Sequence, residues 1–295
     1  MTEQAIAMQP RESRVLRFAK GLALIRESWV GMIGLGIILF WSLTAIFADV
    51  LAPFPPNATG IPMALPGGAS LDGSAIHYLG TDQLGRDLLS RIIHGSRQVL
   101  LYAPLATFCA YFVGIPMGLA AGYRRGLTDD VLSFLANVIL SFPVLVLYII
   151  IIATIGASGT NIVLAVTFAS APGIMRIVRG LVLDLRNREY VFAAETRGES
   201  PWRIMLVEIL PNARGPLIVD ACLRLGYVVI TIGTLGFLGL GLPPPDPDWG
   251  GMVSETRAYA MMLPHMAIFP CIAISSLVLG FNLLADGLRE VSLRD

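Results

Sequence analysis

Residues 131–155 read VLSFLANVILSFPVLVLYIIIIATI, a run of 25 residues that contains no charged side chain. A helix needs about 20 apolar residues to cross the hydrocarbon layer of a membrane, so this run is long enough to span one. Comparable apolar stretches occur elsewhere in the chain, and they lie at residues 30–52, 98–122, 160–183, 216–241 and 267–288. The sequence therefore predicts an all-α membrane protein with six transmembrane helices.

The composition of the whole chain agrees with this fold class. Of the 295 residues, 55% are hydrophobic and 14% are charged, and the mean hydropathy is +0.70. A soluble domain usually carries about a quarter charged residues, so this chain has too few of them to cover a surface that faces water. The 21 basic and 21 acidic residues cancel, and this balance gives no indication of a nucleic acid partner. We expect membrane lipid to surround much of the chain.

The distribution of basic residues predicts the orientation of the spans. Cytoplasmic loops of membrane proteins carry an excess of lysine and arginine. If the N-terminus lies in the cytoplasm, 16 of the 21 basic residues fall on the cytoplasmic side and four on the outer side. We therefore expect both termini to lie in the cytoplasm.

This orientation divides the chain into segments. Residues 11–29 have the apolar spacing and basic charge of an amphipathic helix, which would lie on the inner membrane surface or on a partner. The apolar run of the first span is too long for a cleaved signal peptide. The predicted segments are a cytoplasmic N-terminal segment at 1–29, the first transmembrane helix at 30–52, an outer loop at 53–97, a core of five transmembrane helices at 98–288 and a cytoplasmic tail at 289–295.

The second span contains glycines at steps of four residues, Gly114, Gly118 and Gly122. Residues four apart lie on one face of a helix, and small residues on such a face let a second helix approach closely. The spacing predicts close helix–helix packing.

The inner connection between the fourth and fifth spans, from Arg176 to Pro216, is long and basic and still has helix-like apolar spacing. Gly198 and Pro201 stand within it as a helix stop followed by a new start. The pattern predicts two short helices joined by a sharp turn and lying across the cytoplasmic end of the bundle.

The same connection resembles a known motif. Residues 190–198 read YVFAAETRG, and Leu210-Pro211-Asn212 follow after nearly a dozen residues. This arrangement resembles the EAA motif in the membrane subunits of binding-protein-dependent ABC importers. The resemblance implies that residues 187–215 form coupling helices, which sit in a groove of an ATPase subunit and transmit its opening and closing. The positions that match the motif are Ala193, Ala194, Gly198, Leu210 and Pro211.

Two positions differ from the motif. Phe192 stands where the family has a leading acid, with Glu195 one turn later, and Glu208 replaces an isoleucine. Glu195 and Glu208 are therefore both candidates for a polar contact to the ATPase. Elsewhere the residue types suit the implied role, because the small side chains of Ala193 and Ala194 permit close docking and Gly198 permits a bend. Pro211 would set the backbone where the chain turns back toward the fifth span.

Three further runs resemble the dipeptide, oligopeptide and nickel permeases, specifically the C-type half of a two-permease pair. They are GTDQLGRDLLSR at 80–91, GFLGLG at 236–241 followed by PPPDPDWG at 243–250, and NLLADGLR at 282–289. The resemblance covers about residues 20–292. It implies a peptide or related small solute, a bacterial cytoplasmic membrane, a second homologous permease, two ATPase subunits and a periplasmic or lipid-anchored solute-binding protein.

The outer loop contains Asp82, Arg86 and Asp87, which are spaced to form local ion pairs on a short helix that leads into the membrane. This helix would offer a docking surface for the external binding protein or form a lid over the closed outer mouth. Trp249, between Asp248 and Gly250, is typical of an anchor at the membrane interface.

Some polar residues lie inside the apolar spans. Asp220 and Arg224, four residues apart near the inner end of the fifth span, are expected to pair with each other. The uncharged polar residues either line a translocation path or make hydrogen bonds between helices. They are Ser133, Asn137 and Ser141 in the third span and Thr231 and Thr234 in the fifth.

The sequence shows no set of catalytic residues. His77, His94 and His265 are scattered without the spacing of a metal site. Lys20 is the only lysine and does not belong to a phosphate-binding loop. We therefore predict no catalytic residue, no metal site and no cofactor in this chain, with ATP and Mg bound by the partner ATPases. The alternative function is a secondary, ion-coupled transporter, which would typically show internal repeats and charges at the membrane midplane.

Overall fold

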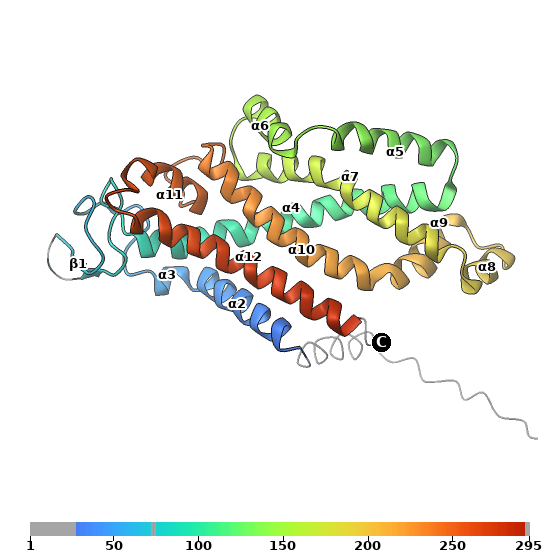
Figure 1. Cartoon of the computed structure of the whole chain (residues 1–295), viewed down its shortest axis with the longest axis horizontal. Helices are drawn as coiled ribbons and strands as arrows, with labels where there is room; N and C mark the ends of the chain where they lie inside the picture. The colour runs from blue at the N-terminus through green and yellow to red at the C-terminus, as the bar shows by residue number, and fades with distance from the viewer. Residues whose placement is uncertain (1–27, 72, 74, 293–295) are drawn as a thin grey trace, which may run out of the picture.

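The computed structural model describes residues 28–71, 73 and 75–292. Most of the predicted amphipathic helix at 11–29 lies outside these residues. The described chain forms an elongated bundle of helices with one short β-hairpin (Figure 1). Its elements are α2 (Trp29–Ile46), α3 (Ala48–Leu51), β1 (Gly68–Ala69), β2 (Ile76–His77), α4 (Leu88–Arg124), α5 (Leu127–Leu140), α6 (Val144–Ile155), α7 (Gly159–Leu185), α8 (Glu189–Thr196), α9 (Pro201–Arg203), the π-helix η1 (Ile204–Ile209), α10 (Leu210–Phe237), α11 (Trp249–Thr256), the 3-10 helix η2 (Arg257–Tyr259) and α12 (His265–Ser292).

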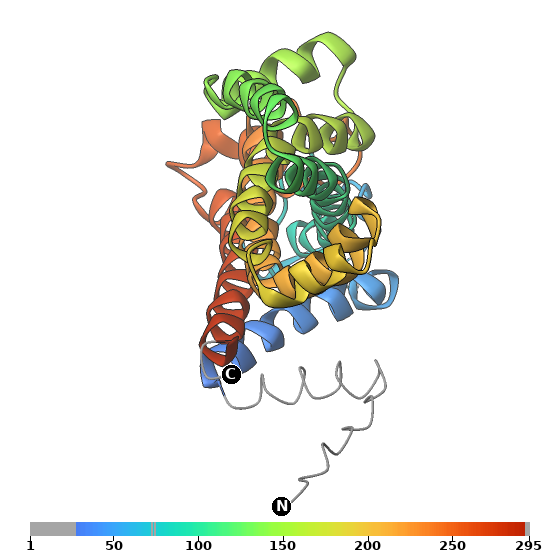
Figure 2. The same cartoon turned by 90° about the vertical axis from the view of Figure 1, so that its right-hand side faces the viewer.

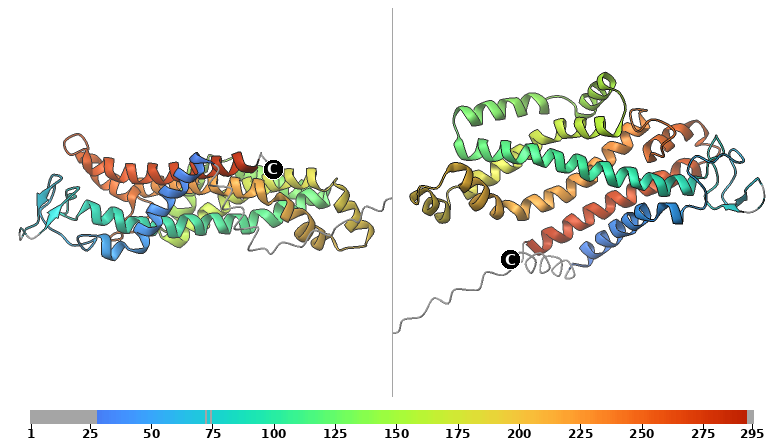
Figure 3. Two further views of the ribbon diagram at one scale, coloured as in Figure 1. Left: turned by 90° about the horizontal axis from the view of Figure 1, so that it is seen from below. Right: turned by 180° about the vertical axis from the view of Figure 1, so that it is seen from behind.

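The long helices α4, α7, α10 and α12 run along the long axis of the bundle (Figures 1 and 3). The outer loop, with the β1–β2 hairpin, and α11 gather at one end, and α8 and α9 lie at the opposite end. Within the described residues, five helices are long and apolar enough to cross a membrane, and the bent pair α5–α6 supplies a sixth candidate. This agrees with the predicted all-α membrane fold.

The pairing of α2 with α12 brings together the two ends of the described chain. The Ser28 hydroxyl, which caps the start of α2, lies 2.9 Å from Glu290 Oε2 near the end of α12. Close packing continues along both helices, because a side chain added at Gly280 would lie 3.0 Å from Ile37. The first and last spans are therefore antiparallel neighbours.

The glycine stripe of α4 packs against α7, as its spacing predicts. A Cβ atom added at Gly114 or at Gly122 would lie 2.7 Å from a side chain of α7, and one at Gly118 would lie 2.5 Å from Val178. Real side chains do not approach this closely, so any larger residue would separate the two helices. The stripe is a packing surface.

The predicted third span, residues 131–155, is not one straight helix. α5 ends at Leu140 and α6 begins at Val144, and the two helices are bent by 86° relative to each other. Pro143 lies at the break. Proline lacks a backbone N–H and disfavours the helical conformation of the preceding residue. The first helix therefore ends before Pro143, although the sequence stays apolar beyond it.

Two other helices are longer than the apolar runs that predicted them. α4 begins at Leu88 because the Asp87 carboxylate caps it and accepts a hydrogen bond of 2.8 Å from the Ser90 amide. α7 continues to Leu185, so Arg176 and Arg179 lie inside a helix and not in the inner connection where the sequence placed them.

Candidate functional site

The segment between α7 and α10 forms the end of the bundle that lies opposite the outer loop. Figure 2 looks onto this end and shows α8 lying across the bundle. On α8, Val191 and Ala194 are fully buried against Ile204, Met205 and Ile209, whereas Ala193 is exposed. One face of α8 therefore attaches it to the following helix, and the opposite face is open.

The turn after α8 depends on Gly198. Its φ of +74° lies in the left-handed region, and the Glu199 amide donates a hydrogen bond of 3.2 Å to the Ala194 carbonyl. This is the geometry of a glycine that ends a helix. Ser200 then caps the next helix, which begins with Pro201. The predicted sharp turn between a helix stop and a new start is confirmed.

The second of the two predicted short helices is not separate. α9, η1 and α10 continue from Pro201 to Phe237 as one helix of 37 residues. Leu210 and Pro211 occupy its interior, so the chain does not turn back at Pro211 as expected. Proline is tolerated there because the six-residue π-helix Ile204–Ile209 precedes it and changes the hydrogen-bond pattern.

Two contacts attach this segment to the membrane helices. The Tyr123 hydroxyl, near the end of α4, lies 2.9 Å from Glu195 Oε1. The Arg186 guanidinium donates a hydrogen bond of 3.1 Å to the Tyr123 carbonyl. Glu195, one of the two candidate carboxylates, is thereby joined to α4 of its own chain.

Glu208, the other candidate, belongs to an ion-pair group around the turn. Arg197 lies 2.9 Å from Glu199 and 3.8 Å from Glu208, and Arg203 lies 3.2 Å from Glu199. These are exposed pairs, which contribute about 0–1 kcal/mol each to stability. These ion pairs contribute little to the stability of the fold, and their main effect is to hold the charged side chains around Gly198 in place.

Four large apolar side chains remain exposed at this end, and we call them the end patch. The exposed fractions are 53% for Phe192, 48% for Trp202, 51% for Leu206 and 55% for Val207. Charged side chains lie at the same end, because the Arg124 guanidinium lies 5.3 Å from the centre of the Trp202 ring and Arg203 follows Trp202 directly, as expected for a surface in water and not in lipid. In the sequence, Phe192 stands out only as a departure from a motif, although an apolar residue on the side of α8 away from Val191 and Ala194 was a usable signal.

The polar residues of the third and fifth spans separate into two groups. Ser133 and Asn137 line a hollow of about 470 Å³ together with Arg176 and Arg179 of α7. The other three donate hydrogen bonds to carbonyls of their own helices, and they are Ser141, Thr231 and Thr234.

The expected pair in the fifth span is confirmed. Arg224 Nε lies 2.7 Å from Asp220 Oδ2, and the Tyr111 hydroxyl of α4 also bonds this carboxylate. The Asp220 carboxylate therefore joins α10 to α4 as well as pairing with Arg224.

The outer-loop residues Asp82, Arg86 and Asp87 are buried, with exposed fractions of 2%, 6% and 1%. Arg86 Nε lies 2.6 Å from Asp82 Oδ2, which confirms the local ion pair, and Arg86 also bonds Glu255 of α11 at 2.5 Å. They lie in a folded loop and not on an exposed helix. The prediction that these three side chains form the docking surface is therefore wrong, because each is enclosed by its own chain.

The Asp87 carboxylate has two roles in this loop. It caps α4 through Oδ2, and its Oδ1 lies 2.9 Å from His77 Nδ1 of strand β2. The His77 ring in turn stacks on Phe54 with 4.4 Å between ring centroids. The loop is thus held to the start of α4 by buried polar contacts.

Trp249 is fully buried and is not an interface anchor. Its Nε1 donates a hydrogen bond of 2.9 Å to the Ile92 carbonyl, and its ring packs on Trp41 at 4.9 Å between centroids. Asp248 caps α11 by accepting bonds from the Gly250 and Gly251 amides. Burial raises the pKa of the Asp248 carboxyl to about 6, although these amide hydrogen bonds act in the opposite direction.

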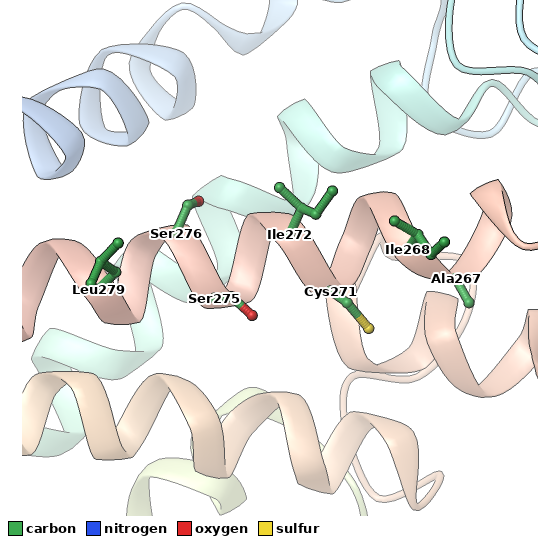
Figure 4. A pocket seen from close by; sticks show the side chains of 7 residues that line it. All are labelled: Ala267, Ile268, Cys271, Ile272, Ser275, Ser276 and Leu279. Atoms are coloured by element: carbon green, nitrogen blue, oxygen red, sulfur yellow. The ribbon is translucent and has the colours of Figure 1, made fainter.

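A second hollow, of about 400 Å³, runs along one side of α12 (Figure 4). Alkyl side chains dominate its lining, and Ser276 is already engaged as the acceptor of a 2.9 Å hydrogen bond from Trp41. It offers no charged group to a solute. Within the described residues, no group of His, Cys, Asp and Glu side chains is arranged to hold a metal ion.

Comparison with known families agrees with this architecture. Residues 114–294 match the family described as binding-protein-dependent transport system inner membrane component. Residues 24–66 match the N-terminal transmembrane domain of oligopeptide transport permease C. The first match covers more than half of the chain and includes α7, the end patch and α12.

Individual relatives are similar over most of their length. The chain is 40% identical over 217 residues to the glutathione transport system permease protein GsiD of Pectobacterium atrosepticum, covering 74% of this chain and 72% of the relative. It is 36% identical over 262 residues to the dipeptide transport system permease protein DppC of Haemophilus influenzae, covering 88% of each. It is 35% identical over 291 residues to the probable D,D-dipeptide transport system permease protein DdpC of Escherichia coli, covering 99% of this chain and 96% of the relative.

A solved structure shares the fold. A chain of the MetNI methionine ABC transporter, in an inward-facing conformation, superposes with a TM-score of 0.58 at 20% identity, covering 69% of this chain and 97% of that chain. Proteins of the matched family are multi-pass inner-membrane subunits that work with an ATPase and a solute-binding protein and have no ATPase domain themselves. This chain belongs to the family of binding-protein-dependent transport system inner membrane components, and it is a permease subunit of an ATP-driven ABC importer.

Proposed function

We propose that this permease forms half of a translocation path for di- or oligopeptides, with a second homologous permease as the other half. Two ATPase subunits would bind ATP and Mg and drive the cycle, and a periplasmic or lipid-anchored binding protein would deliver the solute. Both termini would lie in the cytoplasm, as the distribution of arginines indicates. The peptide assignment rests on the names of the relatives, which transport dipeptides or glutathione.

The observation that carries the coupling role is the end patch. Its four apolar side chains are about half exposed at an end of the bundle that also carries charged residues. Large apolar side chains gathered at a water-facing surface mark a site that another protein covers. The ATPase is the partner that binding-protein-dependent importers require on the cytoplasmic side, so we assign the patch to it.

The structure suggests how movement would pass from the ATPase to the membrane helices. α8 is attached to α4 by the Tyr123–Glu195 hydrogen bond and to η1 through the buried face of Val191 and Ala194. ATP binding would close the ATPase dimer and carry residues 187–215 inward. Because α10 is continuous with the helix beginning at Pro201, this displacement would act directly on the wall of the path.

Site-specific photocrosslinking in the assembled transporter tests this assignment. A photoreactive phenylalanine analogue at position 192 should crosslink to the ATPase. The same analogue at Leu71, which is 74% exposed in the outer loop, should not. The assignment is wrong if position 192 yields no ATPase adduct, or if a cysteine placed there reacts with a membrane-impermeant thiol reagent added to intact cells.

Solute class is tested separately by uptake into proteoliposomes that contain all subunits. ATP-dependent accumulation of a labelled dipeptide, lost when the binding protein is omitted, is the expected result. If the complete transporter hydrolyses ATP in response to its binding protein but accumulates no di- or oligopeptide, the peptide assignment fails and the coupling role does not.

A further inference from the structure

Arg176 lies in the C-terminal half of α7, a helix that is long and apolar enough to span the membrane. It precedes the end of α7 at Leu185 by nine residues, which is about 14 Å along the helix axis. An arginine within a membrane-spanning segment usually faces the bundle interior or a water-filled cavity. Arg176 is exposed in the isolated chain and lines the polar hollow between α5 and α7.

Neighbouring arginines are already matched by acids of their own chain. Arg179 forms two hydrogen bonds of 2.6 Å to the two oxygens of Asp129. Arg224 lies 2.7 Å from Asp220. The Arg176 guanidinium instead donates to the neutral Asn137 Oδ1 at 2.5 Å and has no acidic partner among the described residues. The hollow therefore has a net positive charge.

The hollow has room for part of a solute. Its volume of about 470 Å³ lies within the range of about 300–1,000 Å³ that is usual for small-molecule sites. Its four lining residues are all polar, and Ser133 is held by a 2.9 Å hydrogen bond to Asp129. Asn137 occupies one edge of the Arg176 guanidinium, which leaves the remaining N–H donors of this planar group for a ligand.

Polar side chains of α10 lie close to α7 one turn before Arg176. A side chain added at Gly173, three residues before Arg176 on α7, would lie 3.5 Å from the Arg224 guanidinium. Arg224, Tyr227 and Thr231 follow one another at helical spacing along α10, and Tyr227 is 68% exposed. These side chains lie outside the hollow itself, which is lined by residues of α5 and α7.

We propose that Arg176, positioned by Asn137, is a recognition site for a carboxylate group of the transported solute. The guanidinium plane matches a carboxylate in two parallel hydrogen bonds, and a peptide carries such a group at its C-terminus. The proposal rests on the transport function proposed above and specifies which part of the solute the permease contacts. Arg179, one turn after Arg176 on α7, also lines the hollow, and Asp129 pairs with Arg179 so that its charge is neutralised, whereas Ser133 and Asn137 line the hollow from α5.

The charge of the hollow can be measured without knowing the solute. In the assembled transporter, with Cys109, Cys222 and Cys271 replaced, Ser133→Cys is treated with anionic and cationic thiosulfonate reagents of similar size. The unpaired cation should make the anionic reagent react about 10-fold faster than the cationic one, as expected for a unit charge at this range in a partly screened site. Arg176→Gln should remove this preference, whereas Arg257→Gln, at an exposed arginine in η2 outside the spans, should retain it.

A ligand with and without the carboxylate identifies what the site binds. Alanyl-alanine should slow the labelling of the Ser133→Cys variant, and its C-terminal amide should not. In uptake assays, Arg176→Gln should raise the KM for the dipeptide at least about 10-fold with a smaller change in kcat. Asn137→Asp keeps the size of the side chain and places a negative charge beside Arg176, so it should raise the KM to the same extent.

Each outcome decides the proposal. Equal labelling rates by the two reagents would show that the charge is already neutralised, for example by an acid of the second permease, and would overturn it. So would an unchanged KM in Arg176→Gln when the wild-type transporter accumulates dipeptide. If the wild-type transporter accumulates no peptide at all, the peptide assignment fails, and the labelling preference still tests the anion site on its own.

Discussion

Replacing Gly198 by valine would strain the backbone of the turn after α8 without creating a clash. The glycine has a φ of +74°, and no atom lies within 4 Å of the position that a Cβ would occupy. The cost is therefore that of the left-handed conformation itself, about 1–2 kcal/mol for a residue with a Cβ and more for a β-branched one. A cost of this size lowers the ratio of formed to unformed turn by about 5–30-fold.

Gly239 provides a matched control. It follows α10 with a φ of +77° and equally open surroundings, and the Leu240 amide bonds the Leu235 carbonyl just as the Glu199 amide bonds that of Ala194. Gly239→Val should therefore strain the backbone to the same degree at a site away from the proposed ATPase contact. Both variants should insert into the membrane, because neither substitution lies within an apolar helix.

The assay is the ratio of ATP hydrolysed to solute accumulated, measured in proteoliposomes that contain the complete transporter. Gly198→Val should raise the ratio of ATP hydrolysed to solute accumulated at least about 5-fold, in line with the lower ratio of formed to unformed turn. Gly239→Val should leave it within about 2-fold of wild type. A normal ratio in Gly198→Val, with normal protein levels, would refute the role of this turn in coupling.

Three other predictions concern stability of the purified subunit. Gly118→Ala should lower the free energy of unfolding by about 1–3 kcal/mol in detergent melts, because its Cβ would lie 2.5 Å from α7, whereas Gly180→Ala, which meets nothing within 4 Å, should not be destabilising. The pKa of Asp248 is raised to about 6, so the folded state binds this proton more tightly than the unfolded state does, and the free energy of unfolding should rise as pH falls from about 6 toward 4. Asp248→Asn should remove this rise. An identical dependence of stability on pH in both proteins would contradict the raised pKa. Trp249→Phe should cost about 1–3 kcal/mol because it removes the buried hydrogen bond from the indole to the Ile92 carbonyl and leaves space where the larger ring packed, and an unchanged melting temperature would show that these contacts are not needed.

The spans were largely predictable because apolar length is a direct physical requirement of the bilayer. Periodicity also predicted the face of α4 that meets α7. The exception is the run 131–155, which is apolar throughout although Pro143 divides it into two helices. Helix ends were less predictable, because caps such as Asp87 extend a helix beyond its apolar part.

The polar residues were harder to place from the sequence. The spacing of Asp82 and Arg86 correctly predicted their ion pair, but the same spacing fits an exposed helix and a buried loop. The contact that helps to enclose Arg86 comes from Glu255, which is 169 residues away in the chain. Likewise, the sequence placed Arg176 at the start of a basic loop. Its contact with Asn137, which belongs to a different helix 39 residues away, could not be seen in the sequence. Long-range contacts of this kind leave no local pattern in a single sequence.

The uninterrupted helix from Pro201 to Phe237 has a mechanical consequence. Its 37 residues correspond to about 55 Å of helix, longer than the thickness of the bilayer core. A displacement at Trp202 can therefore reach the far end near Leu235 along one unbroken element. Part of it can be absorbed on the way, because Pro211 and Pro216 each remove a backbone hydrogen bond and the π-helix Ile204–Ile209 permits a one-residue change of register. Closure at the inner end and opening at the outer end would then be linked by one helix, whose bend sets how much of the movement is passed on.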